Sequence, residues 1–578
     1  MFKRANKITA LLVAAAAIAS VVPTEVLAAD QLKSEKGEIY TAIAYKDGKF
    51  YIGGKPSSKD SAAYYLSDGS YNKLKDIDSE DKAEAYGSKY AEIKDGDYYV
   101  DLSTGKVTED KVKEKELDDA SVSLRNKIKS DNDGRYDADD AKALKEVTKI
   151  PNSKFSEDWY EATYKAKKTD DSINGGADKF NVYTNKDGKY IDADYNLGKI
   201  RVKLSNDKIA TIENTSDGDK DVRASVSDAK VIGQDSNNIY RLAKITVKST
   251  VTANTITEIN NIKVDSSATS LVPSADKTSV SFDVIQSISK SQASKEVNGI
   301  KCAKSTSTYV LSDKDGKKVD LLNASQTGFT VAGGKLINYE ISGNKLEAVS
   351  INLKSKSSTY YVEKSNDDHV TLRDGENSVD TDVDGNLWAL SDSNIYKFDN
   401  NEDFEKIYSV DKEYDNLSVY DKGDLVIWDS GDEIYSIVGK KEATTDNTTN
   451  TNTNTNTNTN TNTNTNTNTN TNAGTPATTS SWVKDSNGKW TYNNADGTKF
   501  TGWLPYGGSW YYLDTDGTMV VGWKKVNNNW YYFNGSGSMM TGWIQDGQTW
   551  YYCNELGIML SNTNIGGYRL GPSGAWVK

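Results

Sequence analysis

The feature that most constrains the fold of this chain is a 20-residue repeat in its C-terminal part. A Gly-Trp pair recurs at regular spacing, followed by a Trp-Tyr-Tyr run and then by a methionine. The recurring positions are Trp503, Trp523 and Trp543, then Trp510, Trp530 and Trp550, then Met519, Met539 and Met559. Aromatic runs bounded by Gly-containing turns are typical of β-hairpins. Because one isolated hairpin is marginally stable, hairpins repeated at this period are expected to stack into a β-solenoid.

This pattern resembles the choline-binding or cell-wall-binding repeats of secreted Gram-positive (clostridial-type) proteins. The resemblance covers about residues 481–560, with Gly-Trp, a turn, Trp-Tyr-Tyr and Gly-x-Met in register. It implies units at about 481–499, 500–519, 520–539 and 540–559, followed by a C-terminal cap up to residue 578. It also implies that ligand cages form between successive hairpins. The residues implied are Trp503, Trp510, Tyr512, Met519, Trp523, Trp530, Tyr532, Met539, Trp543, Trp550 and Tyr552.

Two ligand classes suit such cages, and the sequence leaves them open. The negative face of an aromatic ring attracts a cation such as choline, and the same face also stacks on a sugar ring. The alternative is that half of these rings form the core of a thin solenoid, since alternate residues of a strand face opposite sides. Thr563 stands where the next Gly-Trp tryptophan would fall, so the last cage is expected to lack a wall. Two or three working sites are therefore expected, with Cys553 packed and inert.

Two segments of unusual composition flank the N-terminal part of the chain. Residues 1–28 have a basic start, a short apolar run and small residues before Ala29, which predicts a cleaved secretory signal peptide. Residues 441–480 contain an uninterrupted run of Thr-Asn pairs that cannot form a core. This segment is predicted to be a flexible linker between two separately working parts.

The region between these segments is predicted to be mainly β, so that the whole chain is a multidomain, mainly β protein. Short strands rich in Tyr, Ile and Val alternate with Asp-Gly turns. Its expected parts are a β-hairpin and helical region at 29–150, a β-rich region of unknown function at 151–379, and a β-meander at 380–440. The meander has two hairpins like those of propeller blades, and two are too few for a propeller. The best helix candidates are residues 108–130 and 137–149.

The composition excludes several kinds of chemistry. The chain has one histidine, His369, and two cysteines. Ser-His-Asp or Cys-His catalysis is therefore possible only at His369, and multi-histidine zinc sites and a disulfide framework are excluded. His369 is expected to be solvated in a polar turn. The net charge of −13 gives no general attraction to nucleic acid or to an anionic membrane. We therefore predict no catalytic residues, no cofactor and no metal site.

One acidic motif leaves a metal ion open as an alternative. Asp380, Asp382 and Asp384 precede Gly385 with the spacing that begins a calcium loop. Residue 391, at the twelfth position, is a serine where such loops have a glutamate. An ordinary acidic turn is the favoured interpretation.

These observations predict a secreted, non-catalytic surface protein at the cell wall. Its repeats would anchor it non-covalently to a wall polymer, either choline-substituted teichoic acid or a wall saccharide. The protein partner of residues 29–440 is unknown from the sequence. The alternative is a cell-wall hydrolase that the same repeats target to its substrate, since a glycosidase with two carboxylates needs no histidine.

Overall fold

The computed structural model describes residues 31–439 and 481–577, with gaps in both ranges. The gaps are 138–146, 168–176, 217–220, 323–325, 357–358, 485–488, 494–497, 507–508, 515, 527–528, 547–548, 555–556, 562, 566–567 and 572. The predicted signal peptide, the predicted linker and most of the predicted helix at 137–149 lie outside the described residues. The chain divides into two compact units, Met1–Thr449 and Asn450–Lys578. Among the described residues, no helix is both long and apolar enough to cross a membrane.

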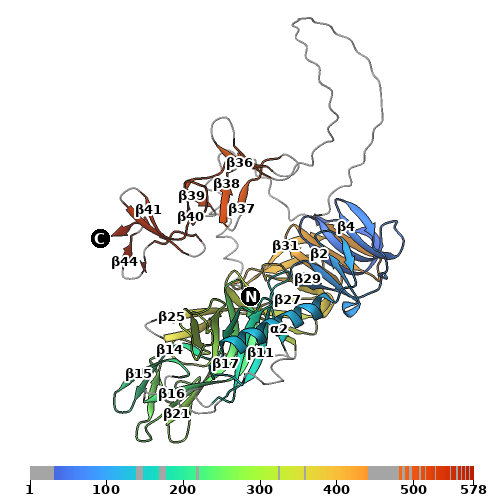
Figure 1. Cartoon of the computed structure of the whole chain (residues 1–578). Helices are drawn as coiled ribbons and strands as arrows, with labels where there is room; N and C mark the ends of the chain where they lie inside the picture. The colour runs from blue at the N-terminus through green and yellow to red at the C-terminus, as the bar shows by residue number, and fades with distance from the viewer. Residues whose placement is uncertain are drawn as a thin grey trace, which may run out of the picture. The chain divides into compact units, whose positions relative to one another are not determined.

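The second unit consists of the predicted antiparallel hairpins and a small cap (Figure 1). Its hairpins are β35–β36 (Ser481–Lys484, Trp490–Asn493), β37–β38 (Gly502–Tyr506, Ser509–Leu513), β39–β40 (Gly522–Val526, Asn529–Phe533) and β41–β42 (Gly542–Asp546, Thr549–Cys553). The cap is a three-stranded sheet of β43 (Asn564–Ile565), β44 (Tyr568–Leu570) and β45 (Trp576–Val577). Backbone hydrogen bonds join successive hairpins, because the N–H of Met539 donates to the carbonyl of Trp510 at 2.7 Å and that of Met559 to Trp530 at 2.8 Å. The predicted stack of hairpins is confirmed.

The first unit contains six sheets. The seven-stranded sheet has β32 (Asn416–Asp421), β33 (Asp424–Asp429), β34 (Ile434–Val438), β2 (Glu35–Tyr45), β3 (Lys49–Pro56), β4 (Ala62–Ser67) and β5 (Ser70–Lys73). Two four-stranded sheets have β6 (Ala83–Tyr86), β7 (Tyr90–Ile93), β8 (Tyr98–Asp101) and β9 (Lys106–Thr108), and then β10 (Thr148–Lys149), β11 (Trp159–Lys165), β12 (Lys179–Asn185) and β13 (Tyr190–Asp192). The five-stranded sheet has β1 (Gln31–Leu32), β31 (Phe404–Val410), β30 (Asn394–Phe398), β29 (Leu387–Ser391) and β28 (Val379–Thr381).

The other two sheets lie in the middle of the sequence. The ten-stranded sheet has β16 (Val222–Gln234), β17 (Asn238–Ser249), β20 (Val272–Pro273), β21 (Ser279–Ser289), β22 (Thr306–Val310), β23 (Gln326–Ala332), β24 (Lys335–Ser342), β25 (Lys345–Lys356), β26 (Thr359–Lys364) and β27 (Asp368–Thr371). The remaining four-stranded sheet has β14 (Asn196–Leu204), β15 (Ile209–Asn214), β18 (Ile256–Ile259) and β19 (Ile262–Lys263), and one apolar core joins it to β16, β17 and β21.

Five of the sheets form a propeller-like ring, in which shared apolar cores join four of the five neighbouring pairs and a helix links the fifth pair, β6–β9 and β10–β13. The seven-stranded sheet shares an apolar core with β7 and β8, β11–β13 share one with β16, β17 and β21, and β24, β25 and β27 share one with β29 and β30. β29–β31 of the five-stranded sheet pack on β32 and β33 of the seven-stranded sheet. Within the seven-stranded sheet, β33 and β34 share a further core with β2–β4. The sequence showed propeller-like hairpins only at 380–440, because the other sheets lack a common motif. The expected boundaries at 150 and 379 also cut across this ring, since β2–β5 and β32–β34 lie in one sheet.

The helix α2 (Val112–Asp131) connects two neighbouring sheets of the ring. Ala120, Leu124 and Ile128 are buried along one stripe at four-residue spacing, and the last two pack in the core with β11 and β12. One turn earlier along the same stripe, Glu116 accepts a hydrogen bond from Tyr86 of β6 at 2.9 Å. The helix predicted at 108–130 is thus confirmed. At the end of the second predicted helix, by contrast, residues 148–149 form the strand β10.

Candidate functional site

The repeat unit brings aromatic rings together in groups of three, which we call aromatic trios. Each trio contains the tryptophan of a hairpin's first strand, the tyrosine opposite it in the second strand, and a tyrosine of the next unit or of the cap. This tryptophan follows a glycine in every unit except the first, where Ser481 precedes Trp482. The trios are Trp482, Tyr492 and Tyr511; Trp503, Tyr512 and Tyr531; Trp523, Tyr532 and Tyr551; and Trp543, Tyr552 and Tyr568. In each trio the tryptophan lies 4.8–5.3 Å from both tyrosines, between ring centroids. All these pairs meet edge to face, at angles of 63–79°.

Strand alternation explains how one hairpin serves two trios. Trp503 lies directly opposite Tyr512 in the register, so both side chains share one face of the hairpin. Tyr511 lies opposite Leu504 on the other face, where its ring contacts Trp482 of the preceding unit. The sequence left open that the aromatic residues on one face of each hairpin form only the core. In the hairpins, aromatic residues from both faces take part in the trios. Both faces contribute rings, and the first tyrosine of each Trp-Tyr-Tyr run belongs to the preceding trio.

The core of the solenoid is built from other positions. Leu513, Phe533 and Cys553, one residue after each Trp-Tyr-Tyr run, have no exposed surface. Cys553 is packed as predicted, and burial raises the pKa of its thiol to about 11. The rings of the trios are mostly half-buried, whereas Trp510 and Trp530 are 47% and 42% exposed. The aromatic positions therefore form a surface over a thin aliphatic and phenylalanine core, and that surface remains open to a ligand.

The predicted site residues occupy different places around the trios. Trp510 lies next to Trp503, with ring centroids 6.2 Å apart, at the exposed edge of the trio. The thioethers of Met519 and Met539 pack against Gly537 and Gly557 in the turn of the following unit. A Cβ on either glycine would overlap the methionine, so these methionines fix the spacing between units. The sequence analysis missed Tyr511, Tyr531 and Tyr551, which only the stacking of neighbouring hairpins places beside a tryptophan.

The cap completes the last trio. Trp543 contacts Tyr552 at 5.3 Å, and Tyr568 of β44 contacts Trp543 at the same distance from the other side. Trp576 packs in turn on Tyr568 at 5.4 Å. The sequence predicts that the final cage lacks a wall, because Thr563 replaces a tryptophan. The cap instead supplies a tyrosine in the place that Tyr531 and Tyr551 take in the earlier trios.

One carboxylate lies beside the tryptophan ring of the third trio. The indole N–H of Trp523 donates to Oδ2 of Asp546 at 3.1 Å, and Asp546 is exposed. A negative charge at the edge of the tryptophan adds to the negative potential of the ring faces. This part of the solenoid therefore favours a positively charged ligand.

The acidic motif of the first unit has other partners. Asp380 forms an ion pair with Lys154 and accepts the backbone N–H of Val419 at 2.7 Å. Asp382 accepts the amide of Asn386 and the indole N–H of Trp388, both at 2.8 Å. Over the residues that the structure describes, no three such side chains are placed to hold a metal ion.

His369 lies in a strand, which corrects the predicted turn. It belongs to β27, opposite Glu347 of β25, and its side chain is exposed. Its solvated environment agrees with the sequence interpretation.

The stacked hairpins and their aromatic trios define a repeat-built binding module of the solenoid class. The family model of the choline-binding repeat matches residues 479–521 and 520–563. The choline-binding domain of Spr1274 from Streptococcus pneumoniae is 48% identical over 14% of this chain and 96% of its own length, with a TM-score of 0.13. The chain therefore belongs, through these residues, to the proteins with choline-binding repeats. Repeats of this family imply anchoring at the cell wall.

Two further solved structures are similar to parts of the chain. The Cpl-1 endolysin, crystallised with a peptidoglycan analogue, is 38% identical over 17% of this chain and 30% of its own length, with a TM-score of 0.14. Choline-binding protein F from Streptococcus pneumoniae is 19% identical over 46% of this chain and 80% of its own, with a TM-score of 0.17. No curated protein sequence matches the chain.

Proposed function

We propose that this protein is a secreted, non-catalytic surface protein that is held non-covalently on the cell wall by choline groups bound at its aromatic trios. The observation that carries the proposal is the repeated trio itself, in which two tyrosine rings meet one tryptophan ring in each successive unit. The ring of sheets in the first unit would then be displayed at the wall through the predicted Thr-Asn linker.

The mutual orientation of the rings favours choline over a wall saccharide. A sugar stacks on one flat aromatic face, which needs a ring whose face is free. In the trios, neighbouring rings stand at 63–79° to one another, so that their faces meet at an angle and a compact group can contact more than one face. A trimethylammonium group is compact, has no hydrogen-bond donor, and is attracted by the ring faces.

The expected strength of one site explains why the unit is repeated. Each ring contributes about 0.5–2 kcal/mol to the binding of a cation, depending on its burial. Three half-buried rings therefore reach roughly 3 kcal/mol, and burial of the three choline methyl groups at about 0.8 kcal/mol each adds about 2 kcal/mol. The sum corresponds to a Kd of roughly 0.1–1 mM. A polymer with many choline groups can occupy several trios at once, and such avidity exceeds single-site affinity by about 10²–10⁴-fold.

The test is elution of the full chain from purified choline-bearing walls. We expect free choline at millimolar concentration to release the protein, and N-acetylglucosamine at the same concentration to leave it bound. The Trp523→Ala variant should elute at a lower choline concentration. Val521→Ala is the matched control, since Val521 lies two residues away, is 53% exposed and belongs to no trio. Release by the sugar and not by choline would reverse the assignment of the ligand.

A hydrolase targeted by the same repeats remains the competing function, because a similar repeat occurs in an endolysin. The full chain should give no clearing band in a zymogram cast with the same walls. A clearing band at its molecular mass would replace the non-catalytic proposal and leave the choline anchor intact.

A further inference from the structure

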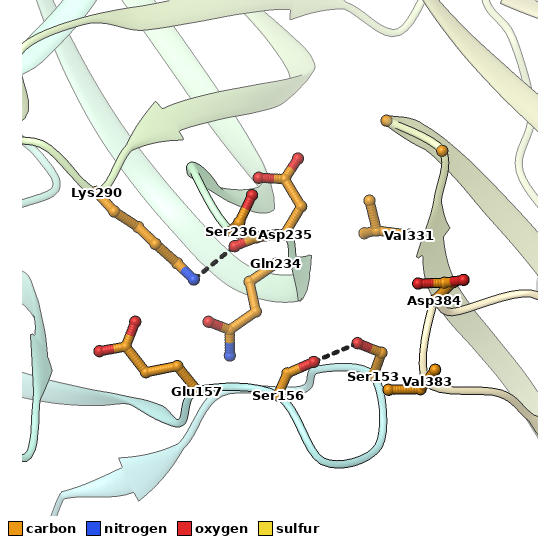
Figure 2. A pocket seen from close by; sticks show the side chains of 12 residues that line it. Ser153, Ser156, Glu157, Gln234, Asp235, Ser236, Lys290, Val331, Val383 and Asp384 are labelled. Atoms are coloured by element: carbon orange, nitrogen blue, oxygen red, sulfur yellow. Dashed lines mark hydrogen bonds between the residues drawn. The ribbon is translucent and has the colours of Figure 1, made fainter. Parts of the chain in front are cut away.

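A cavity of about 370 Å³ lies in the first unit, where four turns of the ring meet (Figure 2). The turns are the β10–β11 loop, the β16–β17 turn, the β23–β24 turn and the β28–β29 turn, which come from three different sheets. We call this cavity the turn pocket. Gly333 and Gly334 form one rim, and open space lies beside both of them. The pocket is therefore a hollow that solvent and small molecules can enter.

The β10–β11 loop is held in place across the ring. The ring of Phe155 contacts Tyr45 of β2 and Tyr420 of β32, with centroids 4.9 and 5.8 Å apart. The neighbouring Lys154 forms its ion pair with Asp380, next to β29. This loop thus connects sheets that lie apart in the ring, and it presents Ser156 and Glu157 to the turn pocket in a fixed position.

A buried amide in the turn pocket has an unpartnered oxygen. Gln234, the last residue of β16, is 4% exposed, and its Nε2 donates to the carbonyl of Ile150 at 3.3 Å. Among the residues that the structure describes, its Oε1 has no hydrogen-bond partner. Figure 2 shows this amide between Lys290 and Ser156, inside the pocket. An unpaired buried acceptor costs about 1–3 kcal/mol, so the site is prepared for a donor from outside the chain.

A buried ammonium lies on the other side of the same space. Lys290 is 5% exposed, its Nζ donates to the carbonyl of Asp235 at 2.5 Å, and it lies 5.4 Å from the Trp159 ring centroid. An ammonium has three N–H donors, so the described bond leaves capacity for a ligand. Burial lowers the pKa of Lys290 to about 8. A polar group that accepts its hydrogen bond would offset part of this burial cost.

The charges around the pocket exclude several ligand classes. Glu157, Asp235 and Asp384 give the lining more negative than positive charge, which disfavours phosphate and other anions. The ammonium of Lys290 disfavours a metal ion. None of the described residues that line the pocket is aromatic, so these residues form no cage for a quaternary ammonium. A neutral hydroxyl group fits best, because it can donate to an amide oxygen and accept from an ammonium at once.

We propose that the turn pocket binds a neutral polyhydroxylated ligand of the saccharide class, with Gln234 Oε1 accepting from one hydroxyl and Lys290 Nζ donating to another. The hydroxyls of Ser153 and Ser156, which bond each other at 2.5 Å, face the ligand from the β10–β11 loop. The volume is at the lower end of the range for small-molecule sites, about 300–1,000 Å³, and suits one or two sugar rings. The first unit would then contact the sugar part of a glycan independently of the repeats.

The test is saturation-transfer NMR of the full chain with N-acetylglucosamine and glucose as probes. We expect at least one of the two sugars to give a saturation-transfer signal with the wild type. In Lys290→Met, the apparent affinity for that sugar should be at least tenfold lower. Lys189→Met is the matched control, because Lys189 lies 5.8 Å from the centroid of the same Trp159 ring but does not line the pocket. The control variant should bind like the wild type.

A second variant, at an exposed position, distinguishes loss of binding from misfolding caused by a substitution at the buried Lys290. Ser236 is exposed at the pocket rim, so Ser236→Trp should block entry without disturbing the core, and it should also abolish the signal. The proposal is overturned if neither sugar binds, or if Lys290→Met and Ser236→Trp both bind like the wild type. Stronger binding of inorganic phosphate or of propylamine than of either sugar also overturns it. Retention on choline-bearing walls should be unchanged in all three variants, so failure here does not bear on the repeats.

Discussion

Replacement of Trp523 by alanine is the sharpest perturbation of the proposed choline site. Its ring lies 5.0 Å from Tyr532 and 4.9 Å from Tyr551, so it joins two successive units. Its indole N–H also donates to Asp546. The substitution removes the shared wall of one trio and leaves the other trios intact.

Two free energies can be worked out for this change. Loss of one half-buried ring should weaken choline binding at that site by about 1 kcal/mol, or about fivefold in Kd. Loss of two edge-to-face pairs, at about 0.5–1.5 kcal/mol each, should lower the stability of the repeats by about 1–3 kcal/mol. The first unit should be unaffected, because it is a separate compact unit.

The assay is equilibrium dialysis of the full chain against labelled choline, with circular dichroism to confirm that the repeats are folded. We expect one site to weaken in Trp523→Ala, so that less choline is bound at low concentration. Trp523→Phe keeps a ring in the trio and should fall between the variant and the wild type. If folded Trp523→Ala binds as much choline at every concentration as the wild type, the trio is not the site.

Three further predictions follow from particular contacts. Tyr568→Ala should weaken choline binding at Trp543 alone, by about fivefold in Kd, because the cap supplies the third ring of that trio. Dialysis should show one weakened site and unchanged binding at the others. Gly537→Ala should destabilise the repeats by at least 1–2 kcal/mol in thermal unfolding, since its φ is +83° and a Cβ would overlap Met519; unchanged stability would contradict the packing. Lys290 has its pKa lowered to about 8 by burial, so the unfolded chain binds more protons between pH 8 and about 10.4, and the stability of the first unit should rise with pH there. Between pH 8 and 9.5, before the tyrosines ionise, the free energy of unfolding of the wild type should rise by on the order of 1 kcal/mol relative to that of Lys290→Met, as measured by denaturant unfolding. Equal pH profiles of the two proteins would refute this.

The repeats could be predicted well because their signal is local. Gly-Trp and Trp-Tyr-Tyr at fixed spacing determine each hairpin, and Trp503 faces Tyr512 by strand alternation alone. The role of Tyr531 could not be predicted in the same way. It depends on how one hairpin rotates against the next, and the packing of Met519 on Gly537 helps to set that distance.

The ring of sheets could not be predicted from the sequence, for a different reason. Its closure depends on pairs far apart in the chain, such as Glu35 with Tyr435 and Gln31 with Ser409. Alternating residues predict single strands, but they carry no information about which distant strand lies beside them. The turn pocket depends on this closure too, because Gln234 and Lys290 meet the β10–β11 loop only in the assembled ring.

The most direct measurement of the proposed function compares retention of the full chain on two preparations of the same wall. One preparation keeps its choline, and the other has had its choline removed chemically while the glycan is left intact. The trios predict strong retention on the first and loss of retention on the second. Equal retention on both preparations would show that the repeats hold the wall through another group.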